Sequence, residues 1–197
     1  YVSIGRISNN QKGSFVDTDN IKRTYIAVEH FITEHRFKRI GYIGIRPIYS
    51  VYADTLEGYR SCLKRYGIEE DREIIYLAKD EDAEEGYKGA KKVLSGSPEC
   101  IVVMGNIVLN GVLRYIAEQK IDIPEDIPII HCSELPLVLP PDIQLTQVRQ
   151  PVFELGRYAI DILLRQIQKK GKREQVVLNP EFYAGSSCGC KLRGGER

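Results

Sequence analysis

Several polar residues follow predicted strands of this sequence at the point where each strand ends. Asn106 follows the apolar run at 100–104, Ser133 follows the run at 129–132, and Gln150 follows the alternating run at 145–149. Tyr52 lies in a polar-aromatic loop, residues 47–52, after the apolar run at 39–45. Loops at the carboxyl ends of parallel strands meet at one edge of a sheet, and ligands of α/β proteins bind there. The predicted chemistry is hydrogen bonding to a small polar molecule in one cleft.

These residues also have purely structural interpretations. Asn106 and Gln150 precede predicted helices, where an amide side chain can cap the first turn. The acidic loop at 78–82 ends at the same edge, but acids at the start of a helix are favoured by the helix dipole. His131, inside an apolar run, is either a core residue or a proton switch. The residues alone leave these alternatives open.

Signatures of catalysis are missing from the sequence. The sequence does not suggest a catalytic triad of serine, histidine and aspartate, and it contains no phosphate-binding loop. Gly41 and Gly44 form only half of a dinucleotide-binding fingerprint. Cys188 and Cys190 could form a metal or redox pair, but a one-residue spacing is short for structural zinc and no histidine is adjacent in the sequence. His30 and His35 are interpreted as structural residues of the first helix. We therefore predict a protein that is not an enzyme, with no metal and no cofactor.

The composition narrows the class of protein. Lysine and arginine number 28 against 27 acidic residues, a net charge of +1, which argues against nucleic-acid binding by this chain. No run of about 18 apolar residues predicts a membrane span, and the first residues do not resemble a signal peptide. Five scattered cysteines indicate reduced thiols and a cytoplasmic location. Because the chain opens on Tyr1, we expect a fragment of a longer protein.

Strand and helix patterns alternate along the chain. The predicted strands lie at about 3–5, 39–45, 74–77, 100–104, 129–132, 145–149, 175–178 and 181–184. The predicted helices lie at about 21–34, 53–66, 83–94, 107–119 and 151–170, with Asp19 or Asn20 capping the first. Pro151 suits the first turn of the last helix, whose apolar stripe includes Leu155, Ile160 and Ile167. This alternation predicts an α/β fold, a mainly parallel sheet with helices on both faces.

Several motifs occur in an order that resembles one known family. They are DN at 19–20, AVEHF at 27–31, KRIGYIG at 38–44, LEGYR at 56–60, IPEDIPII at 123–130, LTQVRQP at 145–151 and LG at 155–156. Together they resemble the effector-binding domain of the lactose-repressor/galactose-repressor (LacI/GalR) family, a periplasmic-binding-protein-like fold. The resemblance covers nearly the whole chain.

The resemblance implies a domain organisation. Residues 19–148 correspond to a complete C-terminal subdomain, residues 1–18 and 149–190 to portions of an N-terminal subdomain, and residues 191–197 to a polar tail. A DNA-binding helix-turn-helix and the first part of the N-terminal subdomain would be absent. The apolar stripe of the helix at 151–170 would then be partly uncovered, to be covered by missing chain or by the partner of a homodimer.

The resemblance also implies a set of cleft residues. The family's ligand-binding arginine falls at Thr55 and one of its aspartates at Ser133, so two groups that clamp sugar hydroxyls or carboxylates are replaced. Gln150 is retained, and Asn106 is displaced by one position. Thr55 either lines the cleft or caps its helix. The predicted effector-binding cleft consists of Tyr52, Thr55, Asn106, Ser133 and Gln150, and His131 and Glu134 could contribute to a ligand site that differs from the usual sugar site.

The resemblance implies two functional hypotheses. The first is a small-molecule-sensing and dimerisation domain of a cytoplasmic LacI-type transcriptional regulator. Hinge closure at 149–151 would control DNA binding, which would occur only through the missing N-terminal domain. The second follows from SSCGC at 186–190. This segment resembles the end of repressor-like sensor domains that continue into a signalling output module, such as a diguanylate cyclase.

Overall fold

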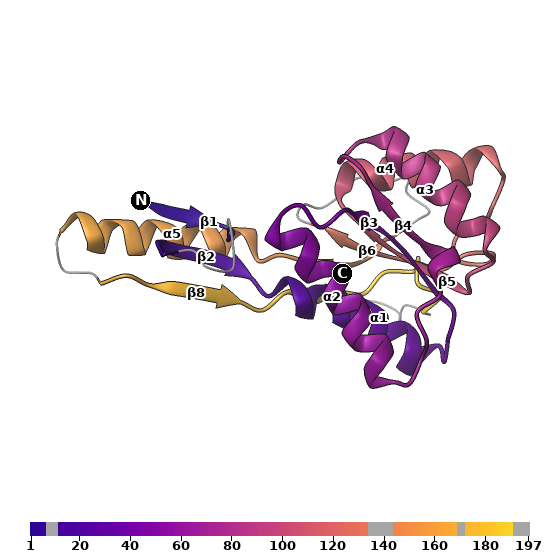
Figure 1. Ribbon diagram of the computed structural model, residues 1–197, viewed down its shortest axis with the longest axis horizontal. Coiled ribbons are helices and arrows are strands. Elements are labelled where there is room, and N and C mark those ends of the chain that lie inside the picture. Colours follow the sequence, from indigo (N-terminus) through magenta and orange to yellow (C-terminus); the bar gives the residue numbers. More distant parts are fainter. Residues whose placement is uncertain (7–11, 134–143, 169–171, 191–197) are drawn as a thin grey trace.

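The computed structural model describes residues 1–6, 12–133, 144–168 and 172–190. These residues form an elongated molecule with a larger part built on a six-stranded sheet and a smaller part built on a three-stranded sheet (Figure 1). The predicted α/β class, with a mainly parallel sheet covered by helices, is confirmed. Within the described ranges, no helix is both long enough and apolar enough to cross a membrane.

The larger sheet has the strand order β4-β3-β5-β6-β7-β9, and its edge strand β9 is antiparallel to β7. The strands are β3 (Ile40–Ile45), β4 (Ile75–Ala78), β5 (Cys100–Met104), β6 (Ile129–Ser133), β7 (Thr146–Arg149) and β9 (Glu181–Tyr183). Helices α1 (Asn20–Glu34) and α2 (Ser50–Arg65) pack on one face, and α3 (Ala83–Ser95) and α4 (Asn106–Glu118) pack on the other. A short 3-10 helix, η1 (Arg72–Ile74), leads into β4.

Alternate residues of the central strands feed two separate cores. All six residues of β3 are buried. Tyr42 packs with side chains of α1 and α2, whereas Ile43 packs with side chains of α3 and α4. Burial on both faces explains why this strand reads as a continuous apolar run and not as an alternating one.

Glycines allow the two helix pairs to approach closely. A Cβ atom on Gly111 of α4 would lie 1.8 Å from the carbonyl oxygen of Ala83, at the start of α3. A Cβ atom on Gly58 of α2 would lie 2.2 Å from the carbonyl oxygen of Ile21, in α1. Any larger residue at these positions would force the paired helices apart.

The smaller part combines a parallel sheet with one helix. Its strands are β1 (Val2–Ile4), β2 (Ser14–Thr18) and β8 (Gln175–Leu178), in the order β1-β2-β8, and its helix is α5 (Val152–Ile167). Leu155, Ala159 and Ile162 of α5 pack against Val16 of β2. Other residues of the predicted stripe, including Ile160 and Ile167, are 59% and 67% exposed. The expectation that the stripe is only partly covered is therefore confirmed.

Two sequence expectations differ from the structure. The strand β2 was not predicted, because its end at Asp17 and Thr18 carries turn-forming residues, yet all five of its residues are buried. The loop predicted at 47–52 was too long, because α2 begins at Ser50 and includes Tyr52.

The subdomain boundaries stay a prediction. Strand β9, within the range 149–190 that the resemblance assigns to the N-terminal subdomain, is hydrogen-bonded into the larger sheet. Glu134 and the last two residues of the helix predicted at 151–170 lie outside the described residues.

Candidate functional site

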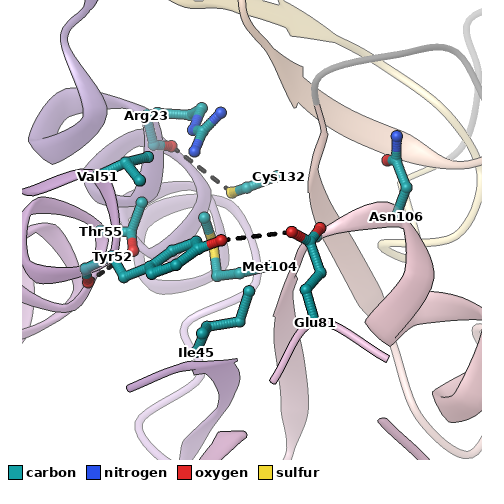
Figure 2. A pocket seen from close by; sticks show the side chains of 10 residues that line it. Arg23, Ile45, Val51, Tyr52, Thr55, Glu81, Met104, Asn106 and Cys132 are labelled. Atoms are coloured by element: carbon teal, nitrogen blue, oxygen red, sulfur yellow. Dashed lines mark hydrogen bonds between the residues drawn. The ribbon is translucent and has the colours of Figure 1, made fainter. Parts of the chain in front are cut away.

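A cleft opens at the carboxyl ends of the central strands, between the first turns of the helices that follow them (Figure 2). The strands contribute Ile45, Met104 and Cys132, which form an apolar floor. The other lining residues are Arg23, Val51, Tyr52, Thr55, Glu81, Gly105 and Asn106. Three of the five residues predicted from the sequence, Tyr52, Thr55 and Asn106, thus meet in one cleft.

Gln150 lies in an adjacent hollow and not in the cleft itself. That hollow is lined by Ile4, Gly5, Arg6, Asp17, Tyr49, Val51 and Gln150, and Val51 lines both depressions. The Thr18 hydroxyl donates a hydrogen bond to Oε1 of Gln150 over 3.2 Å. Ser133 ends β6 in register with Arg149, and its side chain lies outside the described part of the structure. Gln150 therefore lies in a hollow that shares Val51 with the cleft, and it does not line the cleft with the other predicted residues.

Asn106, Gln150 and Thr55 are not the N-caps of helices, the structural role considered for them from the sequence. The N-cap of α4 is Gly105, whose φ of 85° places it in the left-handed region, and Asn106 is the first helical residue. The N-cap of α5 is Pro151 and not Gln150. Thr55 lies inside α2, where its hydroxyl donates to the carbonyl of Tyr52 over 3.0 Å and accepts from Tyr42 over 3.3 Å. Thr55 is thus held by the protein itself at the wall of the cleft.

Tyr52 and Glu81 close one side of the cleft. The Tyr52 hydroxyl donates to Oε2 of Glu81 over 3.3 Å (Figure 2). Glu81 belongs to the acidic loop at 78–82, which connects β4 to α3. The loop was expected to lie at this edge of the sheet, where the strands have their carboxyl ends. Asp82 in the same loop caps α3, because its side chain accepts a hydrogen bond from the backbone N–H of Glu85.

Arg23 is the cleft residue that sequence reasoning missed. Arg23 is 3% exposed, and its Nε and Nη1 atoms have no hydrogen-bond partner among the described residues. Figure 2 shows its side chain at the cleft beside Cys132. Burying a guanidinium without acceptors is costly, and planar oxygen-bearing groups are its preferred partners. Arg23 therefore equips the cleft to bind a ligand rich in acceptor oxygens.

A signal for Arg23 is present in the sequence. The buried residues of α1 are Asn20, Arg23, Thr24, Ala27, Val28 and Phe31, which follow the helical spacing of one inward face. An arginine on the buried stripe of an amphipathic helix is unusual, because arginine is rarely fully buried unless it is paired. This position would have marked Arg23 as a candidate.

An ion-pair cluster joins the smaller and larger parts near the cleft. Arg6, which follows β1, pairs with Asp17 over 2.9 Å and also with Asp54 of α2. The Ser50 hydroxyl donates to the carbonyl of Arg6 over 2.6 Å. Burial raises the pKa of Asp54, and the Arg6 guanidinium opposes that rise. The segments that lead from β2 to α1 and from β7 to α5 both cross between the smaller and larger parts (Figure 1).

His131 belongs to the core beneath the cleft. Its side chain is fully buried, with Nε2 positioned 3.2 Å from the carbonyl of Gly105 and Nδ1 3.4 Å from Nε2 of Gln147. These partners fit a neutral ring that donates from Nε2 and accepts at Nδ1. Burial lowers the pKa of His131 to about 3. The core interpretation of His131 is confirmed, and the ring helps to hold the Gly105 turn at the cleft.

The cleft has no arrangement typical of nucleophilic or acid–base catalysis among its described residues. Its chemistry is that of recognition, with one buried cation, one carboxylate, hydroxyl and amide groups, and an apolar floor. The histidine and cysteine side chains that could hold a metal ion lie outside the cleft, beside the end of α1.

Comparisons with known proteins agree with this architecture. A family described as a periplasmic binding protein-like domain matches residues 28–188. The HTH-type transcriptional regulator MalR of Streptococcus pneumoniae is 30% identical over 163 residues, which are 82% of this chain and 47% of MalR. The HTH-type transcriptional repressor CytR of Escherichia coli is 31% identical over 78% of this chain and 45% of CytR. The chain thus spans about half the length of these relatives.

Solved structures share the fold over almost the whole chain. The transcription regulator CcpA of Lactococcus lactis has a TM-score of 0.84 and 25% identity, over 94% of this chain and 68% of that one. The transcriptional regulator CelR, in a complex with cellobiose, has a TM-score of 0.85 and 22% identity, over 95% of this chain and 58% of CelR.

Proposed function

Since the chain belongs to the periplasmic binding protein-like family and is an effector-binding domain of the LacI/GalR kind, we propose that it senses a small polar molecule for a transcriptional regulator. The observation that carries this proposal is the cleft at the strand ends, lined by the buried Arg23, whose Nε and Nη1 atoms have no hydrogen-bond partner among the described residues. The regulator acts in the cytoplasm as a homodimer, and it contacts DNA through an N-terminal domain outside this chain. It carries out no catalysis.

The proposed ligand presents acceptor oxygens to Arg23. Charged hydrogen bonds from a guanidinium to such oxygens are worth about 1.5–3 kcal/mol each. Vicinal hydroxyls and carboxylates both supply such oxygens, and the apolar floor of Ile45 and Met104 offers a surface for the carbon face of a sugar ring. Sugars, sugar acids and nucleosides are therefore the first compounds to test, and the cellobiose bound to CelR places disaccharides among them. Tyr52, Thr55 and Asn106 would orient the ligand.

The proposed mechanism is closure of the two parts around the ligand. Gln150 and the Arg6 cluster lie at the crossing segments, next to the cleft, so a change of angle there alters the distance between the smaller part and a bound molecule. A ligand that contacts both sides only in the closed form shifts the population toward it. The closed dimer then binds DNA with a different affinity. The alternative, a sensor for an output module such as a diguanylate cyclase, gains no support from the relatives named above.

A ligand panel tests the proposal. Full-length protein is screened by thermal shift against sugars, sugar acids and nucleosides, and each hit is measured by isothermal titration. We expect at least one compound to raise the melting temperature and, in small-angle X-ray scattering, to reduce the radius of gyration. Failure of every compound to bind would contradict small-molecule sensing. Binding without compaction would contradict the closure mechanism alone.

A further inference from the structure

Two histidines and two cysteines converge beside the C-terminal end of α1. The cleft lies at the opposite end of this helix, where its first turn contributes Arg23. The four residues are His30, His35, Cys188 and Cys190, and one ligand atom from each lies within 4.8 Å of all the others. The Cys190 sulfur lies 3.3 Å from Nε2 of His30 and 3.3 Å from Nε2 of His35. In the sequence Cys190 and His30 are 160 positions apart. The spacing along the chain therefore concealed the cluster.

The distances suit a tetrahedral metal ion. Zinc binds sulfur at about 2.3 Å and imidazole nitrogen at about 2.0–2.1 Å, so neighbouring ligand atoms around it lie about 3.3–3.8 Å apart. The two sulfur–nitrogen distances, both 3.3 Å, are slightly shorter than the about 3.6 Å that this geometry gives for a sulfur–nitrogen pair. The donor set is also complete, because two imidazoles and two thiolates fill all four positions of a structural zinc site.

The backbone between the cysteines explains how two residues with a one-residue spacing can both face one metal site. Gly189 has a φ of 88°, in the left-handed region that glycine adopts readily. Its N–H donates to the carbonyl of Ser186 over 2.9 Å, which closes a turn. Both sulfurs consequently reach the same pair of histidines. A Cβ atom on residue 189 would itself lie 3.6 Å from the His35 ring.

The surrounding structure holds the four side chains in place. Ser187, between the turn and the sheet, is fully buried, and its hydroxyl donates to the Ile129 carbonyl over 2.7 Å and accepts from the N–H of Thr146 over 2.9 Å. On the other side, the His30 ring lies 5.0 Å from the Phe182 ring, and the His35 ring stacks on Phe37 at 5.4 Å. A fixed turn and an apolar shell are features that tune and protect metal sites.

We propose that His30, His35, Cys188 and Cys190 form a structural zinc site that clamps the segment at 186–190 onto the end of α1. Imidazole and thiolate ligands in tetrahedral geometry favour Zn²⁺ over the hard cations Mg²⁺ and Ca²⁺. The site joins a segment near the carboxyl end of the described chain to the first helix of the larger part. The proposal departs from the expectation that the histidines are only structural and that the chain holds no metal, an expectation that stays a prediction.

Metal analysis of the full-length protein tests the site. Protein loaded with zinc under reducing conditions and then dialysed is expected to retain one zinc ion per chain. Replacement of zinc by Co²⁺ is expected to give the visible bands of tetrahedral cobalt and a thiolate-to-cobalt charge-transfer band. A chelator is expected to lower the melting temperature. Absence of bound zinc, or an octahedral cobalt spectrum without thiolate bands, would overturn the proposal.

Matched variants locate the ligands. His35→Gln and Cys190→Ser are expected to lower zinc affinity at least about tenfold, because metal sites depend on each ligand. The same change at His131, a buried histidine outside the cluster, is expected to leave zinc retention unchanged. Equal retention by His35→Gln and the parent protein would overturn the assignment. If a variant fails to fold, the cobalt spectrum of the parent protein still decides whether the four residues bind a metal ion. A disulfide between Cys188 and Cys190 that persists under reducing conditions would also refute the site.

Discussion

The buried His131 makes a quantitative prediction about acid stability. In the folded chain the pKa of His131 is lowered to about 3 because burial penalises the charged ring. In the unfolded chain the ring has the ordinary histidine pKa of about 6.5. Below pH 6.5 the unfolded chain therefore binds a proton at this position that the folded chain does not. The free energy of unfolding must fall as the pH drops from 6.5 towards 3.

The size of the effect follows from the two pKa values. Each pH unit across this window costs about 1.4 kcal/mol, so the full window amounts to about 5 kcal/mol. Between pH 7 and pH 5 the expected loss from His131 is about 2 kcal/mol. His131→Gln keeps a hydrogen-bond donor for the Gly105 carbonyl but removes the titrating ring. The variant should therefore lack this part of the acid sensitivity.

Urea unfolding at pH 7 and pH 5, at fixed ionic strength and with a chelator present, measures the difference. The parent protein should lose about 2 kcal/mol more than His131→Gln between these two values. The control is His35→Gln, which removes a partly exposed histidine and should retain the loss that His131 causes. An equal pH dependence in the parent protein and in His131→Gln would refute the reasoning.

Four further substitutions probe packing and charge. Gly111→Ala places a methyl group against the Ala83 carbonyl and should lower the free energy of unfolding by about 1–3 kcal/mol, whereas Gly156→Ala, which meets open space on α5, should leave it unchanged or raise it by up to about 1 kcal/mol. Arg6→Met leaves two aspartates without their cation and should destabilise the chain by about 1–2 kcal/mol in urea unfolding. Arg23→Met removes an unpaired buried charge, so without ligand it should raise the free energy of unfolding by about 1–3 kcal/mol. A loss of stability in Arg23→Met would contradict the inferred cost of leaving Nε and Nη1 of Arg23 buried without acceptors.

Local sequence signals account for most of the fold. The apolar run at 100–104 is the buried strand β5, and the acidic start of α3 is capped by Asp82, because both patterns are set by residues near in sequence. The same signals were misleading at 47–52, where α2 begins at Ser50 inside a segment that looks like a loop. Strand β2 was missed because its end at Asp17 and Thr18 has turn-forming residues, whereas its burial depends on neighbours from the opposite end of the chain, including β8.

The site was only partly predictable for the same reason. Tyr52 and Asn106 lie in or near the connections that follow β3 and β5, so a parallel topology was enough to bring them together, whereas Thr55 was predicted only from the family resemblance. Arg23 reaches the cleft from the preceding helix, and only the inward face of α1 reveals it. The histidines and cysteines beside α1 meet because β9 returns the chain to the larger sheet, a long-range pairing that no local pattern encodes.

The most direct test of the proposed sensing function is the dissociation constant of the ligand found in the panel, measured by isothermal titration for three proteins. Arg23→Met should raise the dissociation constant by about 10-fold to 100-fold relative to the parent protein, because a charged hydrogen bond is lost. Arg60→Met, which removes an exposed arginine paired with Glu70, should leave it unchanged. Equal affinity of Arg23→Met and the parent protein would contradict the account of the cleft.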